Sequence, residues 1–393
     1  MKNPLSERVI KVKPSATIAI SSKAMEMRSA GVDVISMSAG EPDFDTPEYI
    51  KDAAKMAMDS GMTKYTQVDG VPDLKQAIIN KFSEDNDLIY DPENILVSTG
   101  AKQTLYNLFQ AILGPGDEVI IISPYWVSYP DMVLLADAKP VIVDTFQEND
   151  FALDISALAD AINDKTKLVI INSPSNPTGI TFSRSDYESI GAILQNHPDV
   201  YVATDDMYEY IYWGDEPFIS FAQACPSLFD RTITINGVSK SYAMTGWRIG
   251  YCGGPSDVIS GMKKVQRQST SNASSISQAA AIAALNGSKD EIQSMVEQYK
   301  LRHDYLCASL NDIDGFKTTA GTGAFYLFPD VKNLIEKKGF SDDVELSQYL
   351  IEKANVAVVP GSAFGSPGYI RLSYATSLEL IKEAVNRISN SLD

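Results

Sequence analysis

Short runs of apolar residues alternate with amphipathic stretches along most of the chain. The apolar runs are of strand length, and we expect strands at residues 94–98, 118–122, 141–144, 168–172, 200–204, 231–235 and 249–252. Continuous apolar runs of this kind suit a sheet that is buried on both faces. Helical patterns between them, at residues 101–113, 184–195 and 256–268, indicate strand–helix–strand crossovers. The pattern therefore predicts one large α/β domain over about residues 50–285.

The last third of the chain has a different pattern. Residues 289–310 predict one long amphipathic helix, and strand-like pieces follow at 316–328, 356–359 and 369–372. A final helix begins at Leu378, where apolar residues recur at helical spacing. We expect a smaller α+β domain here, formed by residues 286–393 together with residues 1–49. The serine-rich stretch 269–277 predicts a loop.

Charge narrows the classes of partner. The 393 residues include 33 basic and 51 acidic side chains, for a formal net charge of −18. Nucleic acids and anionic membrane surfaces both attract basic proteins, so neither is expected as a partner. No apolar run reaches the length of a membrane-spanning helix, and the first residues carry no hydrophobic signal core. We expect a cytoplasmic protein.

Cysteine and histidine are scarce. The three cysteines are scattered without metal-ligand spacing, which indicates a reducing compartment and no metal site. The sequence has only two histidines, which nearly excludes a histidine-based zinc site or a Ser-His-Asp triad. Neither GxxxxGK[ST] nor GxGxxG is present, so the usual nucleotide-binding fingerprints are missing.

Polar residues follow several of the predicted strands. In open α/β sheets, ligands bind beyond the carboxyl ends of the strands. The turn TGAKQ opens a helix after residues 94–98 and offers backbone N–H groups to an anion. NSPSNPTG follows 168–172, and Asp205 and Tyr208 follow 200–204. These strand ends supply an anion cradle, an amide, a carboxylate and a phenol.

The stretch NGVSKSYAMTGWRIG places Lys240 and Arg248 among small and apolar residues. Either both are surface residues with buried stems, or both line a pocket. In a pocket, a desolvated lysine can lose its proton and become a nucleophile, and an arginine can bind a phosphate bidentately. Together with Asp205 as a partner for a pyridinium nitrogen, this set fits pyridoxal 5′-phosphate.

Six motifs in order carry a resemblance to a known family. They are SAGEPDFDTPE (38–48), TKY (63–65), SPYWVSYP (123–130), NSPSNPTG (172–179), GVSKSYAMTGWRIG (237–250) and IRLSYATS (370–377). The chain resembles the class I aminotransferases of pyridoxal-phosphate fold type I, and among them the bacterial aspartate and aspartate/prephenate aminotransferases. The resemblance implies a mostly parallel seven-stranded sheet sandwiched by helices, with a smaller α+β domain. It also implies a homodimer with shared active sites.

The resemblance assigns roles residue by residue. Lys240 is expected to bond the cofactor and to move the substrate proton, while Asp205 pairs with the pyridine nitrogen. Tyr208 and Asn176 are expected to reach the ring oxygen, and Trp126 to stack on the ring. The expected catalytic residues are Lys240, Tyr208 and Asp205. The expected cofactor-binding residues are Gly100, Ala101, Lys102, Trp126, Asn176, Asp205, Tyr208, Ser239, Lys240, Arg248 and, toward the partner subunit's phosphate, Tyr65.

The implied reaction is ping-pong transfer of an amino group between L-aspartate and 2-oxoglutarate, with prephenate as a further substrate. Arg371 is expected to bind the substrate α-carboxylate and Lys102 the distal carboxylate, while Lys13 matches a position linked to prephenate use. The expected substrate-binding residues are Gly40, Trp126, Asn176, Arg371, Lys102, Lys13, Ser15 and Thr17. Two positions depart from the family pattern: Gly237 stands where many members have serine, and Asp206 replaces a glutamate.

Each residue also has an ordinary structural explanation. Lys240, Lys102 and Arg371 could be solvated surface residues, Trp126 and Tyr208 core aromatics, Asp205 a helix N-cap and Tyr65 a turn residue.

For the whole chain, the alternatives are an aminotransferase for aromatic substrates or alanine, or a pyridoxal-phosphate β-lyase. A binding relative without turnover is a further alternative, but the chain begins almost directly with the family's N-terminal segment, and no DNA-binding domain is expected.

Overall fold

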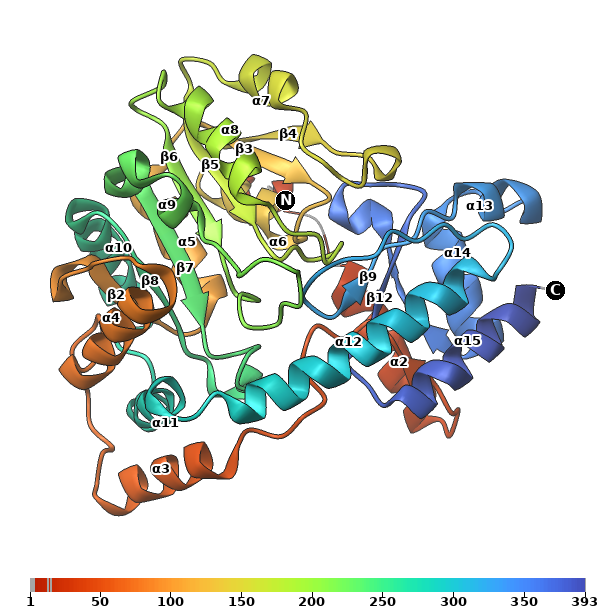
Figure 1. The fold of residues 1–393 in the computed structure, drawn as a ribbon, viewed down its shortest axis with the longest axis horizontal. Coiled ribbons are helices and arrows are strands. Elements are labelled where there is room, and N and C mark those ends of the chain that lie inside the picture. Colours follow the sequence, from red (N-terminus) through yellow and green to blue (C-terminus); the bar gives the residue numbers. More distant parts are fainter. Residues whose placement is uncertain (1–3, 13, 15, 393) are drawn as a thin grey trace.

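A seven-stranded sheet forms the centre of the larger part of the molecule (Figure 1). The computed structural model describes residues 4–12, 14 and 16–392, with side chains from residue 19 onward in the second helix. The strand order is β2 (Ile95–Ser98), β8 (Gly250–Gly253), β7 (Thr232–Gly237), β6 (Tyr201–Asp205), β5 (Thr166–Asn172), β3 (Glu118–Ser123) and β4 (Lys139–Asp144). Only β8 runs antiparallel to its neighbours. The predicted mostly parallel seven-stranded sheet is confirmed.

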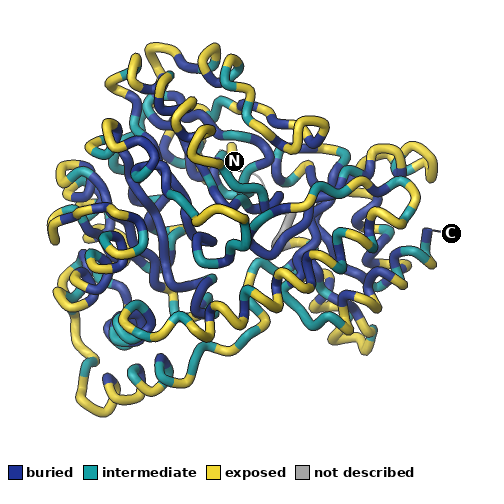
Figure 2. The backbone as a smooth tube through the Cα atoms, viewed as in Figure 1, coloured by how far each residue is buried: buried dark blue, intermediate teal, exposed yellow. Residues whose placement is uncertain are grey.

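Both faces of this sheet are covered, as the continuous apolar runs predict. Neighbouring residues of a strand point to opposite faces, and in β3 Val119 and Ile121 join one buried cluster while Ile120 joins another. The first cluster packs against α5 (Ala101–Ile112), α6 (Ser128–Leu135) and α10 (Ser256–Ser269). The second packs against α7 (Ile155–Ala161), α8 (Arg184–Leu194) and α9 (Phe221–Ala224). Figure 2 shows the sheet buried beneath these more exposed helices.

Helices α3 (Glu48–Asp59), α4 (Pro72–Asn86) and α11 (Ser275–Asn286) lie together at the β2 side of the large sheet (Figure 1). Residues 270–274 of the serine-rich stretch form a loop between two helices, as predicted, but the prediction for 269–277 is wrong at both ends. Helix α10 continues to Ser269, and α11 begins at Ser275 because the Ser274 side chain caps its first turn.

The smaller part contains two short sheets. Strands β11 (Val359–Pro360), β12 (Ile370–Ser373) and β9 (Tyr326–Leu327) form an antiparallel sheet, and β1 (Ile35–Ser36) pairs in parallel with β10 (Val356–Ala357). Around them lie α2 (Ala16–Ser29), α13 (Lys332–Lys338), α14 (Asp343–Tyr349) and α15 (Leu378–Leu392). Helix α1 (Glu7–Lys11) packs instead against α6 of the large part, where Arg8 donates to the Leu135 carbonyl. The pairing of β1 with β10 brings residues 35–36 beside residues 356–357. The division of the chain into two domains at about residues 50 and 285 stays a prediction.

Helix α12 (Asp290–Asn311) runs from the large part to the small one (Figure 1). The strand predicted over 316–328 is wrong for most of its length, since only Tyr326–Leu327 is a strand. This segment pairs with loops of the large part instead: Trp213 N donates to Thr322 O over 2.8 Å, and Ala324 N donates to Ile211 O over 2.8 Å. A Cβ at Gly321 would lie only 2.7 Å from Gly179 O, so glycine permits this close approach. Among the described residues, no helix combines the length and apolarity needed to cross a membrane.

Candidate active site

A cavity of about 450 Å³ opens at the carboxyl ends of β2, β5, β6 and β7. It lies between these strand ends and the β12 sheet of the small part, so both parts contribute walls. The predicted residues that line it are Gly40, Ala101, Lys102, Trp126, Asn176, Asp205, Tyr208, Ser239, Lys240, Arg248 and Arg371. The structure therefore brings together side chains from segments more than 300 residues apart.

Lys240 follows β7 and extends into the cavity, where its Nζ donates a hydrogen bond to the carbonyl of Gly40. Burial lowers the pKa of Lys240 to about 8, and the positive charges of Arg371 and Arg248 act in the same direction. A lysine of this pKa carries a substantial unprotonated fraction near neutral pH. The structure therefore supports the pocket interpretation of this lysine over a solvated surface position.

Asp205 ends β6 beside Asn172, which ends β5. The phenol of Tyr129 donates to Asp205 Oδ2 over 2.6 Å, and Asn172 Nδ2 donates to the Asp205 carbonyl over 2.7 Å. Burial raises the pKa of Asp205, while the hydrogen bond from Tyr129 opposes this rise. The other carboxyl oxygen, Oδ1, is buried and accepts no hydrogen bond from any side chain that the structure describes. This oxygen is suited to a ligand N–H donor.

The first turn of α5 and Arg248 form an anion-binding corner. Gly100 precedes the helix with φ +83°, and a Cβ there would lie 2.3 Å from Arg248 Nη2. Across from it, a Cβ at Gly250 would lie 2.2 Å from Ala101 N. These two glycines let the guanidinium and the helix N-terminus approach each other, and the free N–H groups of that terminus favour an anion.

Lys102 lies on the same turn, with its Nζ 4.9 Å from the centre of the Trp126 ring. Burial lowers the pKa of Lys102, and the charge of Arg248 adds to this effect. The lysine therefore lines the cavity while its side chain stays exposed.

Arg371 is 2% exposed and lies between two aromatic rings, 4.5 Å from the centre of Tyr326 and 4.9 Å from that of Phe364. Its Nη1 donates to Asn176 Oδ1 over 2.9 Å, and its Nη2 donates to the Ser38 carbonyl over 2.7 Å. Burial lowers the pKa of Arg371. Within the described part of the chain, Nε has no hydrogen-bond partner and no carboxylate forms an ion pair with this guanidinium. A buried arginine facing a cavity in this state is suited to a carboxylate ligand.

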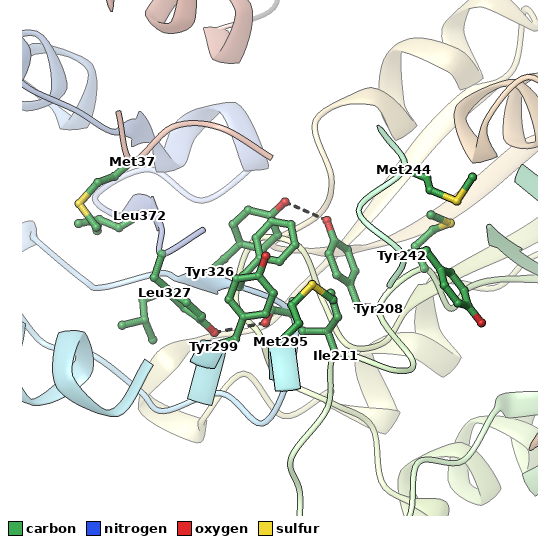
Figure 3. Packing of buried hydrophobic residues seen from close by; sticks show 14 of the residues in the cluster. Met37, Tyr208, Ile211, Tyr242, Met244, Met295, Tyr299, Tyr326, Leu327 and Leu372 are labelled. Carbon is green, nitrogen blue, oxygen red and sulfur yellow. Dashed lines mark hydrogen bonds between the residues drawn. The ribbon is translucent and has the colours of Figure 1, made fainter. Parts of the chain in front are cut away.

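Tyr208 forms a hydrogen bond of 2.8 Å with the hydroxyl of Tyr326, drawn as a dashed line in Figure 3. Tyr208 comes from the segment after β6, and Tyr326 from β9 of the small part. Burial raises the pKa of Tyr208 well above its usual value, so the phenol is a hydrogen-bond donor. The pair joins the two walls of the cavity.

Residues 32–388 match the family of class I and II aminotransferases. The chain belongs to this family. It is an aminotransferase, as the motifs predict, and aminotransferases of this class use pyridoxal 5′-phosphate.

The relatives of this aminotransferase match over nearly their whole length. It is 50% identical to an aspartate/prephenate aminotransferase of Nitrosomonas europaea, with 99% of both chains covered. It is 49% identical to an aspartate aminotransferase of Bacillus sp. strain YM-2, again with 99% of both chains covered. Among solved structures, the aspartate aminotransferase from Rhizobium meliloti has a TM-score of 0.95 and 45% identity, covering 100% of this chain and 99% of that one.

Some predicted residues of the aminotransferase lie outside this cavity. The side chain of Tyr65 is not among the cavity residues and is 91% exposed. Lys13 and Ser15 lie outside the described residues, as does the side chain of Thr17. Their proposed contacts with substrate stay predictions.

The two departures from the family pattern lie beside the cavity and not in its wall. A Cβ at Gly237 would lie 3.0 Å from the Ile249 carbonyl oxygen, so a serine here would fit only tightly against the neighbouring backbone. Asp206 is 1% exposed, and burial together with the nearby Glu209 raises its pKa well above the usual value. Its side chain lies outside the cavity wall, whereas Asp205 lines the cavity.

Two functional residues were missed by sequence reasoning. Tyr129 comes three positions after Trp126, and their rings are 5.3 Å apart in an edge-to-face arrangement, so helical spacing was an available signal. Tyr326 had no such signal, because its motif consists of apolar and aromatic residues typical of a core. Among the described residues, no group of His, Cys, Asp and Glu side chains could hold a metal ion.

Proposed function

We propose that this aminotransferase transfers the amino group of L-aspartate to 2-oxoglutarate in a ping-pong reaction, with prephenate as a further acceptor. The observation that carries the proposal is the cavity itself, in which Lys240, Asp205 and the buried Arg371 face one space. The names of the relatives, aspartate and aspartate/prephenate aminotransferases, support the substrate class.

The residues present fit pyridoxal 5′-phosphate. Asp205 Oδ1 is buried beside the cavity without a side-chain donor, as an acceptor for a pyridinium N–H would be. Arg248, Ser239 and the N–H groups of Ala101 and Lys102 would hold the phosphate. The N–H of Gly100 donates to the Ser98 carbonyl over 2.9 Å, so Gly100 would contribute by its close approach to Arg248. Trp126 would cover the ring, and Tyr208 and Asn176 would reach its oxygen. When bound, the cofactor supplies an electron-withdrawing ring that accepts the electron pair released from the substrate Cα–H bond.

The protein side chains then have distinct tasks. Arg371, held by Asn176 and stacked on Tyr326, binds the α-carboxylate of the substrate bidentately and fixes the direction of its Cα–H bond. Lys240 is free to act as a base once the substrate amino group has replaced its amine on the cofactor. Its neutral amine would then take the proton from the substrate Cα and deliver it to C4′, the cofactor carbon to which the lysine had been bonded. The pKa near 8 keeps this amine able both to accept and to donate a proton near neutral pH.

Lys102 is proposed to bind the distal carboxylate of aspartate and glutamate. It lines the cavity beside Trp126 and is exposed there, and a second substrate carboxylate needs a cation once it is desolvated. Lys13, Ser15 and Thr17 are proposed to complete this side of the pocket and to extend the range toward prephenate. Gly40 would leave room for the substrate close to Tyr326, since a Cβ there would lie 3.1 Å from the Tyr326 hydroxyl.

A homodimer in the cytoplasm is proposed as the working form. Tyr65 is almost fully exposed and lies outside the cavity of its own chain, which supports a contact with the phosphate bound by a partner subunit.

The test is a matrix of amino donors and oxo-acid acceptors with purified protein and added pyridoxal phosphate. Donors are aspartate, glutamate, alanine and phenylalanine, and acceptors are 2-oxoglutarate, oxaloacetate and prephenate. The proposal requires kcat/KM to be highest for aspartate with 2-oxoglutarate, and the oxo acid to appear in equal amount to the new amino acid. Release of ammonia and pyruvate without an acceptor would show a β-lyase instead.

A further inference from the structure

Residues 38–46, which we name the strap, lie against the turn 239–248 that carries Lys240 and Arg248. Two hydrogen bonds fix one end of the contact: Thr46 Oγ1 donates to the Ala243 carbonyl over 2.6 Å, and Trp247 Nε1 donates to Thr46 Oγ1 over 3.0 Å. Closer to the cavity, Thr245 Oγ1 donates to Glu41 Oε2 over 2.9 Å. The strap and the turn are almost 200 residues apart in sequence, so these bonds are tertiary contacts.

The strap is also fixed from the small part. Arg302 of α12 donates to Asp43 Oδ1 over 2.8 Å, and its guanidinium lies 5.1 Å from the centre of the Phe44 ring. At the other end of the strap, Arg371 donates to the Ser38 carbonyl. Within the strap, the Gly40 carbonyl accepts a hydrogen bond from Lys240 Nζ.

We propose that Glu41 and Thr245 are positioning residues for Lys240: their hydrogen bond fixes the strap so that the Gly40 carbonyl holds the lysine amine at the cavity. This inference rests on the proposed function, in which Lys240 is the reacting amine. A lysine side chain has four rotatable bonds, so an amine that must move a proton between two carbons gains from a fixed acceptor at the right place. Glu41 follows Gly40 directly, and a hydrogen bond at Glu41 therefore restrains the peptide group that accepts from Lys240.

Charge gives Glu41 a second effect on the same amine. The charged groups that face Lys240 are Arg371 and Arg248, which disfavour its protonated form, and Glu41 and Asp205, which favour it. The phenol ring of Tyr208 lies 6.0 Å from Nζ. Of the two carboxylates, Asp205 accepts a hydrogen bond from Tyr129 and is the proposed partner of the cofactor ring. Glu41 belongs to the strap and directly follows Gly40, whose carbonyl accepts from the Lys240 amine. Glu41 therefore offsets part of the repulsion that the two arginines exert on the Lys240 ammonium.

The test measures the protonation of Lys240 directly, in protein freed of cofactor. Competitive acetylation over a series of pH values, followed by mass spectrometry of the peptide that contains Lys240, gives the pKa of its amine. The variants are Glu41→Gln, which keeps the shape and removes the charge, Thr245→Val, which removes the donor, and Thr245→Ser, which restores it. Glu379→Gln, at an exposed position in the first turn of α15, is the matched control.

Glu41→Gln is expected to lower the pKa of Lys240 by roughly half a unit, the size of a partly exposed charge contact. Thr245→Val should lower it in the same direction by a smaller amount, and Thr245→Ser should return it to the wild-type value. A pKa that stays at the wild-type value in both Glu41→Gln and Thr245→Val would overturn the proposal and leave the strap a purely structural element. If Thr245→Val does not fold, the partly exposed Glu41→Gln still decides the question.

A second measurement separates this proposal from the proposed function. With cofactor and substrates added, Glu41→Gln and Thr245→Val should shift the acidic limb of the kcat–pH profile and leave the KM for aspartate nearly unchanged, since neither residue touches the substrate carboxylates. A protein without transaminase activity would contradict the proposed function, yet the acetylation profile would still report whether the strap positions Lys240.

Discussion

Tyr129 donates a 2.6 Å hydrogen bond to Asp205 Oδ2, and this leaves Oδ1 as the free acceptor beside the cavity. Both side chains are buried, Tyr129 at 1% and Asp205 at 7% exposure. Burial alone would favour a neutral carboxyl group, which could not stabilise a pyridinium ion. The phenol opposes this effect, and it also fixes the rotation of the carboxylate. In the proposed site, Asp205 would therefore depend on Tyr129, a residue that does not line the cavity.

Tyr129→Phe should impair the site while preserving its shape. The change removes a hydrogen bond to a charged group, which contributes about 1.5–3 kcal/mol, and the kcat should fall roughly 10- to 150-fold. Because the pKa of Asp205 rises further without its donor, pyridoxal phosphate should also dissociate more readily. Tyr106→Phe, on α5, serves as the control. Wild-type kcat and wild-type cofactor affinity in Tyr129→Phe would show that the hydrogen bond has no part in the reaction.

Lys102→Ala should change substrate preference more than overall activity. Loss of a charge-assisted contact to the distal carboxylate costs about 1.5–3 kcal/mol, so kcat/KM for aspartate should fall roughly 10- to 150-fold. The values for alanine and phenylalanine, which have no second carboxylate, should change much less. Equal losses for all three amino acids would instead place Lys102 in phosphate binding.

The low pKa of Lys240 should be visible in protein stability. In cofactor-free protein its pKa is about 8, against an ordinary value of 10.5, so between these pH values the unfolded chain binds a proton that the folded protein does not. Protonation then favours unfolding, and the contribution of this group to stability rises with pH across that window. Denaturant unfolding should show Lys240→Met more stable than the wild type below about pH 8, with the difference shrinking toward pH 10.5. A difference that does not vary with pH would contradict the depressed pKa.

Tyr65 should act across a dimer interface. Tyr65→Ala and Lys240→Ala are each expected to be poorly active, since one lacks the proposed phosphate contact and the other the amine. When the two variants are unfolded and refolded together, mixed dimers gain one site with both residues intact, and activity should recover in part. No recovery, in a mixture shown by mass spectrometry to contain mixed dimers, would place Tyr65 outside the partner's site.

Much of the fold could be predicted because several central strands contain short apolar runs followed by a turn motif, such as ILV in β2 and LVII in β5. For the same reason, the sequence placed Asp205 and Lys240 at one edge of the sheet: parallel strands end together, so the residues after them meet. The positions of Arg371 and Gly40 in the cavity depended on the resemblance, since periodicity gives no relation between β12, the strap and the large sheet.

The remaining features depend on tertiary contacts that have no local pattern. Residues 316–328 carry strand-forming aromatics, yet most of this segment pairs with loops, because Gly321 and Gly323 let its backbone lie against Gly179 and Ile211. The place of Tyr326 in the cavity wall could not be predicted either, since a tyrosine in an aromatic motif is usually a core residue. Its partner Tyr208 lies 118 residues away in sequence, and only the folded chain brings the two hydroxyls together.

The central claim is that Lys240 is the residue that bonds pyridoxal phosphate. Borohydride reduction of the cofactor-loaded protein, followed by digestion and mass spectrometry, tests it most directly, because reduction makes the bond permanent at the lysine that formed it. The account predicts that the mass of the reduced cofactor is found on the peptide containing Lys240, and that Lys240→Ala shows no labelled peptide and almost no turnover. Cofactor mass on a peptide with Lys102 or any other lysine in the wild-type protein would contradict it.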